Sequence, residues 1–273
     1  MTTTGALTWM GVLAGIGVAI DSVAGLWARA ALSDTGIFAF GPLQTGWKRC
    51  LHGPASRPLS WLFEYPRVLV LFVAQLAAVA ALLAVPWLSE SRQALVAAAG
   101  ASVVLAARML LHARNHVGND GADQMALVVF TSVLVGWLTI GTRVAVVAVC
   151  YAALQLLLSY SVAGLAKLSS RTWRDGTAVP AILNTAGLGS PALARLLRPH
   201  RTLAWALCWS VIAFECLVPA WLLMGTRGVY IVIALGCMFH AGVAVTLGLN
   251  TFFWSFDAAY PALIVLGERT GVI

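Results

Sequence analysis

The chain has 273 residues, of which 60% are hydrophobic and only 10% are charged. Soluble domains carry about 25% charged residues, so this composition excludes an ordinary soluble globular protein. The net charge of +7 comes from 17 basic and 10 acidic residues. In a chain this apolar, a basic excess indicates membrane topology and lipid headgroups rather than nucleic acid. We therefore expect an integral membrane protein with the lipid bilayer as its partner and no nucleic acid.

The apolar residues occur in long unbroken runs rather than in amphipathic stripes, and a bilayer core requires about 20 such residues per helix. The sequence contains seven long runs of this kind and a shorter eighth run, Phe252–Leu266. The eighth run contains Asp257 and Pro261, so it is either an eighth span or a partly inserted segment. The sequence predicts an all-α fold, a polytopic transmembrane helix bundle with 7–8 spans, forming one domain over residues 1–273. The seven longer runs are Leu7–Ala30, Val68–Leu88, Ala94–Leu111, Met125–Ile140, Val144–Ala166, Leu203–Met224 and Val229–Leu249.

A short helix is expected between the fifth and sixth spans. Ser190 followed by Pro191 is a typical helix start, with a capping hydroxyl and then a first-turn proline. The segment Ala192–Arg198 that follows contains three leucines and two arginines. We expect it to be an interfacial amphipathic helix, because its leucines require an apolar surface and its arginines require water or phosphate.

Several ionisable side chains fall at membrane depth, where each costs about 2.5–3.5 kcal/mol to insert unless it has a partner. We expect Asp21, Arg108, Glu215 and His240 to face the bundle interior, and at least two of them, or one of them with Lys167, to lie within hydrogen-bonding reach of each other. Asp21 with Arg108 is compatible with a structural ion pair that locks two helices. A lone core histidine is commonly structural, and a lysine at a helix end commonly reaches towards the interface. The residues are Asp21, Arg108, Glu215, His240 and Asp257, with Lys167 at the end of the fifth span.

The segment YSVAGLAKL, Tyr160 to Leu168, is followed closely by WRDGTA, which begins at Trp173. This pattern resembles the horizontally transferred transmembrane (HTTM) domain superfamily, which includes the vitamin K-dependent gamma-glutamyl carboxylases. Phe214-Glu215, Phe239-His240 and the turn Asn119–Asp123 are similar to later or intervening parts of that superfamily, in the same order. The resemblance covers about residues 5–265, and the length is closest to small bacterial SdpB-type peptide maturation proteins.

The resemblance implies a chemistry. The lysine that matches Lys167 acts as a base on a reduced quinone of the vitamin K or menaquinone type, with O₂ and CO₂ as co-reactants. A lysine can do this only when it is neutral, which burial favours. By the same resemblance His240 would orient or relay a proton and Glu215 would pair with one of the two. Structural or supporting roles fall to Asp21, Arg108, His116, Asp120, Trp173 and Arg174. No metal is expected.

Two functions therefore remain open. The first is a membrane-embedded enzyme that matures a secreted peptide or modifies a small molecule. Because the sequence ends soon after its last apolar run, we expect it to lack large extramembrane domains and to act with a small accessory protein or on a small substrate. The second is a non-catalytic membrane assembly or maturation factor with the same fold. A transporter would be expected to show an internal repeat or paired broken helices.

Two arguments predict opposite orientations of the protein in the cell membrane. Eleven basic residues lie on the face that includes the Lys167 end of the fifth span, and four lie on the other face, which places the Lys167 end in the cytoplasm. The carboxylase resemblance places it outside. Long folded loops weaken the charge rule. We therefore expect a multi-pass protein with an outward-facing Lys167 and a cytoplasmic N-terminus.

Overall fold

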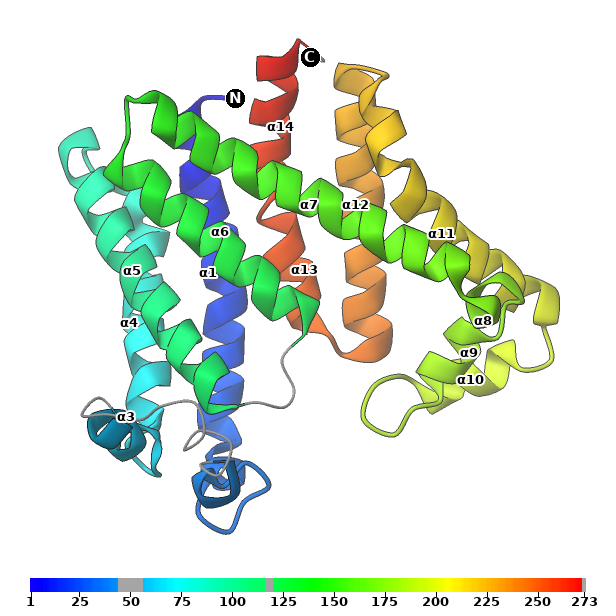
Figure 1. The fold of residues 1–273 in the computed structure, drawn as a ribbon, viewed down its shortest axis with the longest axis horizontal. Coiled ribbons are helices and arrows are strands. Elements are labelled where there is room, and N and C mark those ends of the chain that lie inside the picture. Colours follow the sequence, from blue (N-terminus) through cyan, green and yellow to red (C-terminus); the bar gives the residue numbers. More distant parts are fainter. Residues whose placement is uncertain (44–55, 116–119, 272–273) are drawn as a thin grey trace.

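A computed structural model describes residues 1–43, 56–115 and 120–271, and every regular element in this part of the chain is a helix (Figure 1). Seven of these helices are long and apolar enough to cross a membrane. The predicted all-α transmembrane bundle is therefore confirmed. The long helices are α1 (Thr3–Trp27), α4 (Leu69–Ala84, continued by the 3-10 helix Val85–Trp87), α5 (Glu90–Arg114), α6 (Gly121–Leu138), α7 (Arg143–Ser169), α11 (Arg201–Leu222) and α12 (Thr226–Leu247).

Shorter helices fill the connections. A 3-10 helix, Arg29–Leu32, and α3 (Ser56–Phe63) lie between the first two spans. Between α7 and α11 the chain forms α8 (Arg171–Arg174), α9 (Ala178–Leu183) and α10 (Pro191–Leu197). In Figure 1 these three helices lie beyond the adjoining ends of α7 and α11, on the far side of the molecule from α4 and α5.

The helix α10 agrees with the predicted segment to within one residue at each end. The Ser190 side chain accepts a hydrogen bond from the Leu193 amide, so the predicted cap is confirmed. One face of α10 buries Ala194 and Leu197 against Leu183 of α9, whereas Arg195 and Leu196 are exposed. The helix is thus amphipathic, and its exposed side carries both cationic and apolar groups.

The eighth apolar run is a broken helix at the centre of the bundle. It forms α13 (Asn250–Asp257) and α14 (Tyr260–Thr270), joined by Ala258 and Ala259, both of which have no exposed surface. These two helices pack against α1, α6, α7 and α12. The run is therefore neither a continuous eighth span nor a peripheral segment, and its residues are among the most buried in the described part of the chain.

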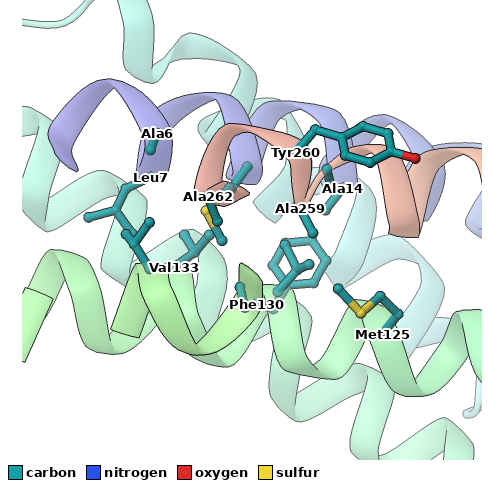
Figure 2. Close-up of a cluster of buried hydrophobic side chains, with 14 of the residues drawn as sticks. Ala6, Leu7, Ala14, Met125, Phe130, Val133, Ala259, Tyr260 and Ala262 are labelled. Atoms are coloured by element: carbon teal, nitrogen blue, oxygen red, sulfur yellow. The ribbon is translucent and has the colours of Figure 1, made fainter. Parts of the chain in front are cut away.

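Small residues allow this central packing. Figure 2 shows Ala259 and Ala262 facing Phe130 and Val133 of α6, next to Leu7 and Ala14 of α1. Alanine side chains let the broken helix approach its neighbours closely, while the larger side chains of α6 and α1 fill the remaining volume. Tyr260 carries its hydroxyl away from this apolar cluster.

Candidate functional site

The first polar cluster joins α7 to α11 through Lys167 and Glu215. The Lys167 Nζ donates to both carboxylate oxygens of Glu215, at 2.7 and 2.9 Å. The Glu215 side chain is 5% exposed and that of Lys167 is 21% exposed. The expectation that Glu215 pairs with Lys167 or His240 is thus confirmed for Lys167. The ion pair keeps its acid buried and leaves its amine partly accessible.

The two helices can bring these side chains together because Gly164 lies between them. A Cβ atom at Gly164 would be 2.8 Å from both the amide nitrogen and the Sγ of Cys216. Such a distance is too short for any real side chain, so only glycine permits this approach of α7 to α11. Gly164 is one turn before Lys167, and Cys216 follows Glu215 directly. The close approach therefore fixes the separation of the ion pair.

The loop after α7 covers the amine. The Lys167 Nζ lies 5.2 Å from the centre of the Trp173 ring, within the range of a cation–π interaction. The next residue, Arg174, is exposed, and its backbone carbonyl accepts a hydrogen bond from Trp209 Nε1 at 3.1 Å. The Thr177 hydroxyl donates to Asp175 at 2.7 Å and lowers the pKa of that carboxyl. Trp173 and Arg174, both predicted as supporting residues, are thus placed next to Lys167 or in the loop that covers it.

The second polar cluster surrounds His240 of α12. The Tyr160 hydroxyl lies 2.7 Å from His240 Nε2 and 2.6 Å from the Tyr260 hydroxyl. His240 is 2% exposed, and its ring stacks on Phe256 with a centroid distance of 4.8 Å. Its Nδ1 has no hydrogen-bond partner. The expectation that His240 faces the bundle interior is confirmed.

Tyr160 and Tyr260 were not predicted as site residues. A signal for Tyr160 is present in the sequence, because Tyr160, Gly164 and Lys167 are spaced i, i+4 and i+7 and so share one face of α7. Phe214 packs on Tyr160 with a centroid distance of 5.3 Å, immediately before Glu215 on α11. Tyr160 therefore joins the second polar cluster to the α7–α11 interface that holds the first. Nothing local marks Tyr260 except its place in the eighth run, three residues after Asp257.

Arg108 and Asp21 belong to a different network. Arg108 donates to Asp21 at 2.6 Å and to Asp123 at 2.9 Å, and the Thr251 hydroxyl donates to Asp21 at 3.2 Å. These bonds connect α1, α5, α6 and α13. The predicted ion pair of Asp21 with Arg108 is confirmed. Its second acid, Asp123, was not expected.

Asp120 caps the start of α6. Its side chain accepts hydrogen bonds from the amides of Ala122 and Asp123, and the Asp120 amide donates one to the Asp123 carboxylate. Burial raises the pKa of Asp120. Its place in the structure is that of a helix cap beside the Arg108 network. His116 lies outside the described residues, so its supporting role stays a prediction.

In the described part of the chain, no three His, Cys, Asp or Glu side chains lie close enough together to hold a metal ion. Comparisons with protein-family models, with curated proteins and with solved structures each give no match. The likeness to the HTTM superfamily therefore depends on the sequence motifs alone.

Proposed function

We propose that the protein is a membrane-embedded enzyme of the cell membrane that uses Lys167 as a base and a reduced quinone as its cofactor. Its substrate would be a secreted peptide or a small molecule. The observation that carries this proposal is the partly exposed Lys167 amine, held by a buried carboxylate at the end of an otherwise apolar helix. A lipid-facing site would allow a hydrophobic cofactor to enter from the bilayer.

The ion pair sets a condition on this chemistry. Lys167 accepts a proton only when it is neutral, whereas an ion pair with Glu215 holds it protonated. Movement of one proton from Nζ to either Glu215 oxygen gives a neutral amine and a neutral acid. A poorly solvated site favours that uncharged form over two separated charges. Lys167 and Glu215 would therefore act as a unit, with Glu215 storing the proton.

The side chains around His240 are chemically suited to contact a quinone. Tyr160, Phe214, Phe239 and Phe256 supply aromatic surface around His240, and the unpartnered Nδ1 of His240 is a hydrogen-bonding group suited to a quinone oxygen. A bound reduced quinone would supply electrons to O₂, and CO₂ would be the unit added in a carboxylation. His240 would hold or relay a proton, and Trp173 would keep water from the Lys167 amine.

The second candidate is a non-catalytic maturation factor. It is favoured by the loop between α7 and α11, in which Arg171, Arg174, Arg195 and Arg198 are all exposed. A secreted peptide or a small accessory protein with acidic residues would find a complementary surface there. In this case the Lys167–Glu215 pair would serve to join α7 to α11.

The test uses purified full-length protein in lipid nanodiscs with chemically reduced vitamin K and O₂. Oxidation products are separated by chromatography, and empty nanodiscs correct for spontaneous oxidation. Lys167→Ala should lower the protein-dependent rate by about 10²-fold or more, as expected for removal of a general base. Arg92→Gln, at an exposed position at the start of α5, is the control and should keep the full rate. A wild-type rate equal to that of empty nanodiscs would overturn the proposal of an enzyme and favour the maturation factor.

A further inference from the structure

Asp257 is a buried acid without a cationic partner. It is 7% exposed, and its Oδ1 has no hydrogen-bond partner. None of the ion pairs in the described part of the chain includes it. An isolated carboxylate in an apolar interior is so costly that such a group takes up a proton or binds a cation. The burial of Asp257 therefore requires a bound positive species.

The position of Asp257 in the fold is unusual. It is the last residue of α13, at the break in the central helix, and α14 begins at Tyr260. Broken helices inside membrane bundles leave backbone groups free and are common places for ion or proton binding. Here the break is surrounded by α1, α6, α7 and α12.

One turn of α12 contacts both ends of this break. The Cys237 side chain lies next to the Asp257 carboxyl. At the preceding residue, Gly236, an added Cβ would be 1.7 Å from the Tyr260 hydroxyl. Because Gly236 and Cys237 are consecutive, the Asp257 carboxyl and the Tyr260 hydroxyl lie against the same turn. The space for the Tyr260 hydroxyl exists only because residue 236 has no side chain.

From Tyr260 two hydrogen bonds lead away from the break. The Tyr260 hydroxyl meets that of Tyr160 at 2.6 Å, and the Tyr160 hydroxyl meets His240 Nε2 at 2.7 Å. A phenol can donate and accept at once, and an imidazole can accept a proton at one nitrogen and release one at the other. The far nitrogen, His240 Nδ1, is the unpartnered end of the series.

We propose that Asp257 is held as the neutral acid and that it exchanges its proton through Tyr260, Tyr160 and His240. For each proton that leaves Asp257, every intervening group accepts one proton and releases one, and His240 releases one from Nδ1 to solvent water. The proton itself is the ligand of this site. The proposal does not depend on Lys167 being a base.

The charged groups around Asp257 and its hydrogen-bonded neighbours indicate that Asp257 binds a proton rather than pairs with a fixed counter-ion. The other ionisable groups facing it are Cys237 on α12 and Glu215 on α11, which is already paired with Lys167. On the side of α1 and α6, Asp21 and Asp123 are both paired with Arg108. No free lysine or arginine of these packed helices faces Asp257 in the described structure.

Infrared spectroscopy of the full-length protein in nanodiscs tests the protonation state. A protonated carboxyl has a C=O stretching band that a carboxylate lacks and that moves in D₂O. The wild-type spectrum minus that of Asp257→Asn should contain this band. A carboxylate band in its place, enhanced by sodium or potassium salts, would instead show a cation site and overturn the proposal.

The rate at which the same band shifts in D₂O tests the proposed route of the proton. Tyr160→Phe keeps the aromatic ring but removes the linking hydroxyl, and should slow the shift of the Asp257 band in D₂O by about tenfold, the equivalent of one lost buried hydrogen bond. Gly236→Ala should also slow it, because it displaces the Tyr260 hydroxyl. Gly242→Ala, on the same helix with nothing within 4 Å of its added Cβ, should leave the rate unchanged. Circular dichroism confirms that each variant is folded. Equal rates of the band shift in the wild type and all three variants would refute the proposed proton route.

Discussion

The bundle contains two ion-pair networks that differ in the chemistry of their cations. Arg108 is shared between Asp21 and Asp123, which reach it from α1 and α6. Lys167 is paired with one acid, Glu215, and also lies over the Trp173 ring. A guanidinium does not lose its proton in proteins, whereas an ammonium group can. The Arg108 network can therefore only hold helices together, while the Lys167 pair can also move a proton.

The two networks also differ in charge balance. Arg108 brings one positive charge to two carboxylates, so its removal leaves both acids without a cationic partner. Lys167 and Glu215 carry one charge each, so the pair can become neutral by an internal proton transfer. Two acids around one cation favour a structural role for the Arg108 network. The one-to-one charge balance of Lys167 with Glu215 is compatible with a chemical role for that pair.

The largest expected effect is on the Arg108 network. Arg108→Met should lower the free energy of unfolding by about 3 kcal/mol, the lower end for breaking a buried pair, because Asp21 is 31% exposed. Lys167→Met should cost less than half as much, since Glu215 can take up a proton. Thermal or chemical unfolding of both variants in one detergent measures the difference. Equal losses would show that the Lys167 pair is as structural as the Arg108 network.

A smaller effect is expected at the close approach of α7 and α11. Gly164→Ala should lower the free energy of unfolding by about 1–3 kcal/mol, because its Cβ forces the backbone of Cys216 away. It should also weaken the Lys167–Glu215 pair and leave the Arg108 network intact. Gly242→Ala is the matched control, with open space around its added methyl group. If Gly164→Ala unfolds like Gly242→Ala, the helices do not need this close contact.

The smallest expected effect concerns the covering ring. Trp173→Leu removes the cation–π contact with Lys167 and should lower the free energy of unfolding by about 0.5–1 kcal/mol. It should at the same time increase the accessibility of the Lys167 amine to a water-soluble amine reagent. Labelling followed by mass spectrometry measures this change, with Trp27→Leu, an exposed ring at the end of α1, as the control. Unchanged labelling would show that Trp173 does not cover the amine.

The bundle itself could be predicted because lipid imposes a simple rule. A backbone in an apolar medium must satisfy its own hydrogen bonds, so each run of about 20 apolar residues forms a helix. The eighth run did not follow this rule, because other helices rather than lipid surround it. Its break at Ala258 and Ala259 is tolerated only inside that protein shell, which no local pattern reveals.

The sequence by itself determined the all-helical membrane fold, the capped amphipathic helix at Ser190 and the need for partners of Asp21, Arg108, Glu215 and His240. The cost of inserting charge depends only on residue type and depth, so it can be read from one chain. Only the tertiary structure decided which partner each residue has. Pairing joins residues such as Lys167 and Glu215, or Tyr160 and Tyr260, that are far apart in sequence. Their distances are fixed by helix packing at Gly164 and Gly236, where a missing side chain lets two helices meet.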